Sequence, residues 1–172
     1  MDRKLKIVEV ELVDAYQQQL SELLVSVVDD GASVGFLPPL SESDAAHYWT
    51  SVLAPGVILF IAEIDHDIAG SIQLQLCKKQ NGSHRAEIAK LMTSPKYRRM
   101  GIGRALMNKA EERAKEEGIR LLVLDTREGD PSNHLYRSIG FIEAGRIPGY
   151  ALSANGSLDA SVFYYKSLVS NE

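Results

Sequence analysis

The segment with the clearest chemical potential is 94–106, where two glycines flanked by arginines stand at the predicted start of a helix. Glycine lets the backbone approach a ligand closely, and the first N–H groups of a helix have no partner within it. Those N–H groups, the helix dipole and nearby guanidinium groups together form a site for pyrophosphate. Because strands are predicted on both sides, at 87–93 and 121–126, the pattern indicates a nucleotide-bearing cofactor.

Three phosphate-loop patterns compete for this turn. A Walker A loop needs four residues between its glycines and then Gly-Lys-Ser/Thr, whereas a single residue separates Gly101 from Gly103. A dinucleotide fingerprint needs a third glycine where Leu106 stands, but Asp125 has the spacing of a ribose-binding acid and keeps that alternative open. The pattern Arg/Gln-x-x-Gly-x-Gly/Ala is met by 98–103. This loop resembles the acyl-CoA loop of the GNAT N-acetyltransferase superfamily, and the simplest alternative is a glycine-rich turn before a surface helix.

The elements that must position this turn follow from hydrophobic periodicity. Ser41 and Asp44 have the spacing of a capping box, and polar Ser71, Gln73 and Gln75 give one strand a polar face. The predicted strands are 5–12, 57–64, 68–76, 87–93, 121–124 (buried on both faces), 141–146 and 162–166, the last two joined by a loop; the predicted helices are 16–28, 41–53, 101–118 and one after Pro131 that stops before Gly140.

This order of elements is similar to the GNAT layout over nearly the whole chain, so residues 1–172 are expected to form a single domain. The resemblance implies an α/β (α+β) fold with a mixed, mostly antiparallel sheet of six to seven strands and about four flanking helices. It also implies that the central strand ending at Thr93 splays from the strand that begins at Leu121, with a bulge.

Further segments resemble the tabtoxin-resistance acetyltransferase subgroup, which acetylates a small amino-acid-derived toxin. They are 31–36, 90–92, 124–126, 148–150 and 163–168. The resemblance implies acetyl-CoA-dependent transfer of an acetyl group to the amine of a small molecule, which is amino-acid-like or toxin-like. A protein N-terminal or lysine acetyltransferase and a non-catalytic acyl-CoA-binding module remain alternatives.

The predicted cofactor site combines the turn with the strand before it. By resemblance, the backbone of the strand end pairs with the pantetheine arm and polarises the thioester, while one of the side chains of Leu91 and Met92 packs in the core. The expected acetyl-CoA contacts are Leu91, Met92, Thr93, Arg98, Arg99, Met100, Gly101, Ile102, Gly103, Arg104, Ala105 and Tyr136.

Tyr136 is the predicted general acid, because it stands in a segment like the family's helix ending Tyr-x-x-x-Gly-Phe. A phenol near the cofactor sulfur can protonate the departing thiolate. The alternative is an aromatic ring that packs under the sheet with a solvated hydroxyl. The family's asparagine, seven residues earlier, is replaced by Gly129, and Asn133 lies three residues before the tyrosine, so the pattern gives no support for an asparagine contact to pantetheine.

Glu87 and Asp125 are the candidate general bases. An alkylammonium has a pKa near ~10.4, so the acceptor must lose a proton before it attacks. The related subgroup has acids at both matching positions, and a carboxylate within a sheet is costly unless it is wet, paired or functional. The alternatives are an exposed strand position for Glu87 and a loop cap for Asp125.

Composition and charge limit which partners, compartment and metals are expected for this chain. The 172 residues carry a net charge of −4, which predicts no broad basic face and hence no nucleic-acid partner. The single cysteine, Cys77, fits a reduced cytoplasmic setting, and the chain has neither an apolar leader nor a run of membrane-spanning length. The four histidines show no metal-binding spacing, so no metal is expected, and a homodimer is left open.

Overall fold

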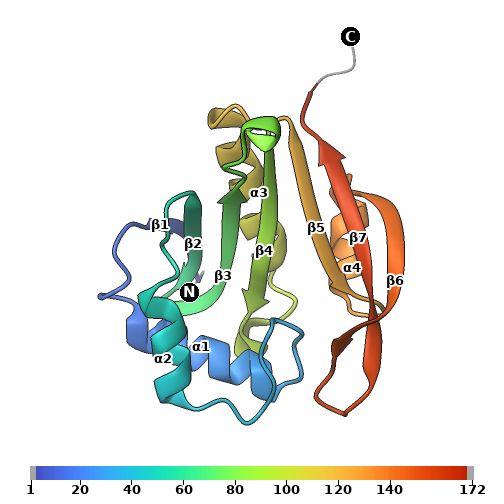
Figure 1. Cartoon of the computed structure of the whole chain (residues 1–172). Coiled ribbons are helices and arrows are strands. Elements are labelled where there is room, and N and C mark those ends of the chain that lie inside the picture. Colours follow the sequence, from blue (N-terminus) through green and yellow to red (C-terminus); the bar gives the residue numbers. More distant parts are fainter. Residues whose placement is uncertain (1–2, 170–172) are drawn as a thin grey trace.

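A seven-stranded mixed sheet with four α-helices makes up the computed structural model, which describes residues 3–169 (Figure 1). The strand order is β1-β2-β3-β4-β5-β7-β6, and β4 with β5 is the parallel pair among antiparallel neighbours. The strands are β1 (Leu5–Val10), β2 (Val57–Ile64), β3 (Asp67–Leu76), β4 (Arg85–Thr93), β5 (Leu121–Arg127), β6 (Ile142–Leu152) and β7 (Leu158–Ser167). The helices are α1 (Gln17–Asp29), α2 (Glu42–Thr50), α3 (Ile102–Glu116) and α4 (Ser132–Ser138), with short 3₁₀ turns η1 (Gln80–Gly82) and η2 (Pro95–Tyr97).

Helices cover the two faces of the sheet unequally. Leu106, Met107 and Ala110 of α3 pack on one face, in the larger of two hydrophobic clusters. On the other face, α1 and α2 cover the β1–β4 half, where Leu24 and Trp49 are fully buried. Within the described residues no helix lies over this second face of β5, β7 and β6 (Figure 1). The uncovered half of the sheet therefore has one face open to solvent.

The predicted fold class is confirmed, but the C-terminal hairpin is longer than predicted. The expected loop between 146 and 162 is mostly strand, and Pro148 and Gly149 lie inside β6, at a register shift between Ile147 and Ala151. Proline lacks an N–H donor, which an edge strand tolerates at a bulge. The prediction was wrong because Pro-Gly is typical of a turn, whereas edge position and bulge are set by the sheet.

The polar row of β3 lies under α2. Ser71 and Gln73 are 0% and 2% exposed, and the Gln73 amide donates to the Tyr48 hydroxyl of α2 at 2.8 Å. Gln75 in turn donates to the Gln73 side-chain oxygen at 3.1 Å. The two glutamines of the polar row thus have the partners that buried amides need, whereas the buried Ser71 hydroxyl has no hydrogen-bond partner among the described residues. The alternation therefore marks a contact with a helix.

The two central strands diverge. β4 pairs with β5 only where Arg85–Glu87 meets Leu121–Val123, and no pairing continues beyond. A register shift between β3 and β4 falls opposite Lys90, whose φ of 53° marks a bulge. The splay and the bulge are thus as expected. The prediction that 121–124 is buried on both faces was wrong, because Leu121 and Val123 remain half-exposed where β4 turns away.

Candidate functional site

The turn between β4 and α3 presents unpaired backbone donors. Gly101 has φ 75°, and the first helical bond runs from the Ala105 N–H to its carbonyl at 3.0 Å. The N–H groups of Ile102, Gly103 and Arg104 therefore precede the helical ladder without a partner in it. A Cβ at Gly101 would meet no atom within 4 Å, and one at Gly103 would stand 3.2 Å from Leu135 Cδ2. This accessible, anion-favouring backbone fits a pyrophosphate group.

The segment just before the glycine turn is bound to the start of β3 by residues that the sequence did not indicate. Buried Tyr97 of η2 donates its hydroxyl to Asp67 at 2.7 Å, and the Lys96 ammonium pairs with the same carboxylate at 3.0 Å. These two contacts, the tyrosine hydrogen bond first, hold the pKa of Asp67 below its usual value. The segment before the glycines is thereby fixed to the start of β3.

The predicted cationic contacts lie at the surface around the turn. Arg98 forms an ion pair with Asp30 at the end of α1, and Arg104 donates to the Ser138 hydroxyl of α4 at 2.9 Å. Arg99 is exposed with φ 59°, and Met100 beside it is also exposed. Two of the three guanidinium groups thus have protein partners next to the helix N-terminus.

The end of β4 divides its side chains between two environments. Met92 is 2% exposed and packs in the core beneath α1, whereas Leu91 is half-buried and lines a pocket. Thr93 lies next to the turn, with its hydroxyl oxygen 4.0 Å from the Cβ position of Gly103. Ala105, half-buried in the first turn of α3, continues the surface beside it.

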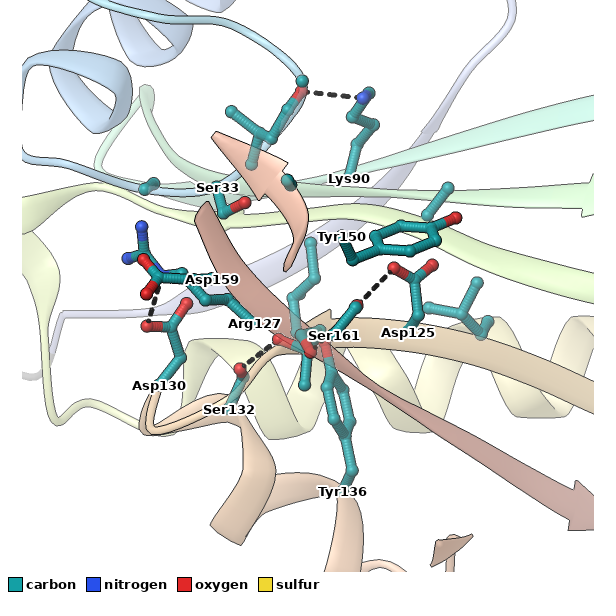
Figure 2. A pocket seen from close by; sticks show the side chains of 18 of the residues that line it. Ser33, Lys90, Asp125, Arg127, Asp130, Ser132, Tyr136, Tyr150, Asp159 and Ser161 are labelled. Carbon is teal, nitrogen blue, oxygen red and sulfur yellow. Dashed lines mark hydrogen bonds and ion pairs between the residues drawn. The ribbon is translucent and has the colours of Figure 1, made fainter. Parts of the chain in front are cut away.

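A pocket of about 390 Å³ occupies the gap where β4 and β5 separate (Figure 2). Its walls come from five parts of the chain: the segment after α1, β4, β5 with the loop that follows it, α4, and the β6–β7 hairpin. Of the predicted site residues, Glu87, Leu91, Asp125 and Tyr136 meet in this pocket, whereas the glycine turn lies outside it.

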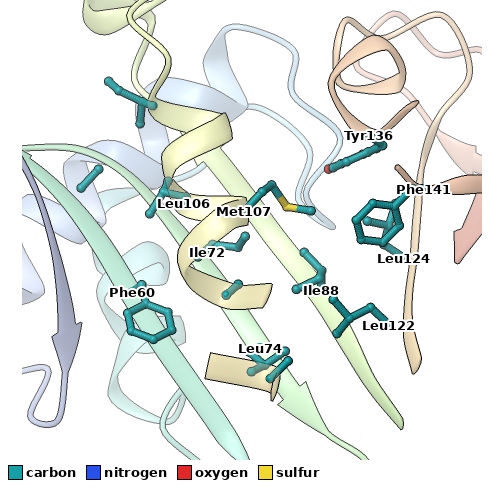
Figure 3. Packing of buried hydrophobic residues seen from close by; sticks show 14 of the residues in the cluster. Phe60, Ile72, Leu74, Ile88, Leu106, Met107, Leu122, Leu124, Tyr136 and Phe141 are labelled. Atoms are coloured by element: carbon teal, nitrogen blue, oxygen red, sulfur yellow. The ribbon is translucent and has the colours of Figure 1, made fainter. Parts of the chain in front are cut away.

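The Tyr136 side chain enters the pocket from the face of the sheet on which α3 packs. The residue is 5% exposed, and its ring packs on Phe141, with ring centroids 6.0 Å apart (Figure 3). The ring of Tyr164 lies 5.9 Å away from it. The Tyr136 hydroxyl has no hydrogen-bond partner among the described residues. Burial, and then the charges of Asp125 and Asp130, raise the pKa of the Tyr136 phenol. It is therefore a protonated donor throughout the neutral range.

The two carboxylates reach the pocket from the opposite face. Glu87 pairs with Val123 across the strands, so the side chain of Asp125, two residues on, shares its face. Asp125 accepts a hydrogen bond from the Ser161 hydroxyl at 2.8 Å. Both carboxylates stay exposed to solvent at the mouth of the pocket, so Glu87 does occupy the exposed strand position considered as an alternative. Partial burial raises the pKa of Glu87, the charge of Asp125 raises it further, and Lys90 opposes the rise. The splay thus brings a proton donor and two acids together from opposite faces.

Asn133 has a structural role. Its amide donates to the carbonyls of Arg127 and Asp130 at 3.0 and 2.9 Å, and its oxygen accepts from the Tyr164 hydroxyl at 2.8 Å. These contacts occupy the side chain in ordering the entry to α4.

Two cations of the pocket were missed by sequence reasoning. Lys90 donates to the Val34 carbonyl at 2.7 Å, and its ammonium lies 2.9 Å from where a Cβ of Gly35 would be. Burial lowers the pKa of Lys90. Arg127 contacts three separate segments, including the Gly31 carbonyl at 2.9 Å. Their partners lie 56 and 96 residues away in the chain, so no local pattern could have indicated them.

The described part of the chain has neither a metal-binding cluster nor a helix that could span a membrane. Residues 3–169 contain no group of three or more His, Cys, Asp or Glu side chains arranged to hold a metal ion. No helix in the same range has the length and apolar character needed to cross a membrane.

Comparison with known proteins gives consistent results. The sequence model of the acetyltransferase (GNAT) family matches residues 34–141. An uncharacterized N-acetyltransferase in the hisH-hisA intergenic region of Azospirillum brasilense is 34% identical over 128 residues, 70% of this chain and 76% of that protein. The N-alpha-acetyltransferase 30 of Xenopus laevis is 31% identical over 102 residues, 59% of this chain and 37% of that protein. The structure of yncA from Salmonella typhimurium, solved with its cofactor acetyl-CoA, has a TM-score of 0.81 at 15% identity and covers 98% of this chain and 96% of its own.

Proposed function

The chain belongs to the acetyltransferase (GNAT) family, and from that premise we propose that it is an acetyl-CoA-dependent N-acetyltransferase acting on the amine of a small molecule. The observation that carries the proposal is the meeting of Tyr136, Glu87 and Asp125 in one pocket at the strand splay. A proton donor and two acids at one point are what acyl transfer to an ammonium-bearing acceptor requires.

Acetyl-CoA supplies an acetyl group activated as a thioester. The free N–H groups after Gly101, with Arg98, Arg99 and Arg104, would bind its pyrophosphate, while the main chain of 91–93 would pair with the pantetheine arm. Alignment of the two substrates by these contacts accounts for several kcal/mol of the barrier in reactions of this kind.

Proton transfer falls to the pocket residues. Glu87, whose pKa is raised by partial burial and by the charge of Asp125, accepts the proton of the acceptor ammonium directly or through water, and Asp125 adds charge that attracts the cation. The free amine would then attack the thioester carbonyl. As the C–N bond forms and the C–S bond breaks, Tyr136 would donate its proton to the departing sulfur, and the excess proton on the nitrogen would restore the phenol. The free hydroxyl of Tyr136 and the retention of both acids argue against a non-catalytic acyl-CoA-binding module.

The pocket favours a small acceptor. Its volume of about 390 Å³ suits a compact molecule, and the segments similar to the tabtoxin-resistance subgroup support an amino-acid-like amine. The similarity to N-alpha-acetyltransferase 30 favours a second candidate, acetylation of a protein N-terminus. We further propose that residues 1–172 act as one catalytic domain in the cytoplasm, without a nucleic-acid or membrane partner.

The test is a panel of amino acids, polyamines, amine antibiotics and short peptides with free N-termini, each incubated with acetyl-CoA and the protein. Release of free thiol and the mass of the product identify the acceptor. We expect turnover with at least one small amine. Turnover confined to peptides would select the second candidate, and acetyl-CoA binding by calorimetry without turnover for any amine would indicate a binding module.

A further inference from the structure

Arg127, the last residue of β5, uses all three of its guanidinium nitrogens on different segments. Nε donates to Asp130 Oδ1 at 3.0 Å, in the loop before α4. Nη1 donates to the Ser153 hydroxyl at 3.2 Å, at the β6–β7 turn, and Nη2 donates to the Gly31 carbonyl at 2.9 Å, after α1. Because the guanidinium fork is planar and rigid, these contacts fix three walls of the pocket relative to one another.

The contact with the β6–β7 turn continues into the hairpin. The Ser153 hydroxyl donates to Asp159, which also accepts from Ser157 at 3.2 Å. Figure 2 shows Arg127 beside Asp130 and Asp159, on the other side of the pocket from Asp125. The hydrogen-bonded chain therefore crosses the end of the pocket that lies away from the Glu87 and Asp125 pair.

Lys90 holds the same segment from the other splayed strand. Its ammonium donates to the Val34 carbonyl at 2.7 Å and occupies the space left by the missing Cβ of Gly35. Segment 31–35, which forms one wall of the pocket, is thus held by a cation from β4 and a cation from β5. The wall spans the gap that the diverging strands leave.

We infer that Arg127 is a specificity-determining residue that closes the far end of the acceptor pocket and limits the acceptor to compact amines. The inference rests on the function proposed above and deepens it. When the acceptor is an internal lysine, the polypeptide continues on both sides of that residue. One of these two chain segments would have to pass the contacts that Arg127 makes. A free small amine ends before them.

The test compares Arg127→Met, which removes the fork, with Arg127→Lys, which keeps the charge without it. Arg120→Met is the matched control, since Arg120 is an exposed arginine just before β5. The first readout is the ratio of kcat/KM for a blocked peptide with one central lysine to kcat/KM for the best small amine. We expect this ratio to be low in the wild type and to rise at least about tenfold in both Arg127 variants, but not in the control.

The second readout is amide hydrogen exchange in 31–36 and 153–157, which needs no acceptor. Exchange should accelerate in both Arg127 variants and stay unchanged in the control. Ser153→Ala removes one of the three groups that accept a hydrogen bond from Arg127, and it should accelerate exchange in 153–157. If an Arg127 variant does not fold, Ser153→Ala takes its place in this test. Unchanged exchange in every variant that folds overturns the closure.

The two hypotheses fail separately. A wild-type protein that acetylates the peptide as well as the small amine overturns the role of Arg127 and leaves N-acetyl transfer standing. A wild-type protein inert toward every amine overturns the proposed function, and the exchange rates then decide alone whether Arg127 holds the pocket closed.

Discussion

The glycine turn and the pocket between β4 and β5, which adjoin along β4, have opposite electrostatic character. The turn offers free N–H groups, a helix N-terminus and the exposed cations Arg98, Arg99 and Arg104. The pocket has Glu87 and Asp125 at one side and Asp130 and Asp159 at the other, against two cations already bound to carbonyls. One end therefore attracts a polyphosphate and the other an ammonium, and each disfavours the other's ligand.

The two regions also use different parts of the chain. The turn presents main-chain donors of consecutive residues, whereas the pocket is lined by side chains from distant segments. A main-chain site is disrupted by adding atoms, while a side-chain site is disrupted by removing functional groups. Variants of the two regions should accordingly separate binding from turnover.

The largest effect is expected at the turn. Gly103→Asp adds a carboxylate where the pyrophosphate would lie, so affinity for CoA should fall by about a hundredfold or more, since hydrogen bonds to charged groups contribute about 1.5–3 kcal/mol each. The nearest obstacle, 3.2 Å from the new Cβ, is the flexible end of Leu135, so the fold should persist. Calorimetry with CoA measures the effect. Gly145→Asp, in open space on β6, is the control, and equal affinity in both variants would remove the turn as the cofactor site.

The next effect is expected for the proton donor of the pocket. Tyr136→Phe keeps the ring against Phe141 and removes the phenolic proton, so kcat should fall by about a hundredfold while KM for acetyl-CoA changes little. Tyr165→Phe, at an exposed tyrosine of β7, is the control. Steady-state kinetics across pH give the answer, and a wild-type kcat would assign Tyr136 to packing alone.

A smaller, pH-dependent loss is expected from the carboxylates. Glu87→Gln and Asp125→Asn should each lower kcat/KM by about tenfold at neutral pH, where the acceptor is protonated, and the double variant should lose more. Activity should partly recover near the ~10.4 pKa of a free ammonium, where unprotonated amine is plentiful. Profiles of kcat/KM parallel to the wild type for all three variants would assign the deprotonation to solvent.

The smallest effect is a displacement of the acidic limb of the same profile. If Glu87 is the base, the wild-type limb should report its protonation, and its raised pKa should bring the loss of activity to a higher pH than an ordinary carboxyl would. Asp125→Asn removes a charge that raises this pKa, so the limb should move to lower pH. Lys90→Met removes a charge that lowers it, so the limb should move to higher pH. Shifts in the same direction in both variants would show that Glu87 does not control the limb.

The amino-acid sequence determined the local features. Glycine spacing, capping residues and hydrophobic periodicity act over a few residues, and they were sufficient to predict α3 with its turn and the strands of the first half. The splay of the central strands was predicted from the family resemblance and not from these patterns. Tyr136, Glu87 and Asp125 could be named because their segments resemble those of the family and its subgroup, and because an acid within a strand is costly unless it is wet, paired or functional. The error around Pro148 arose because a bulged edge strand depends on position in the sheet, and for the same reason the sequence did not indicate that α2 covers the polar side chain of Gln73.

The tertiary structure decided which of these groups meet. Tyr136 and Asp125 occupy opposite faces of the sheet, and they share a pocket only because β4 and β5 stop pairing after Glu87. Arg127 donates a hydrogen bond to the Gly31 carbonyl, 96 residues away in the chain, because the order β4-β5-β7 places the end of β5 beside the segment after α1. Hydrogen bonds of this range depend on strand order and divergence, which are properties of the assembled sheet and of no single segment.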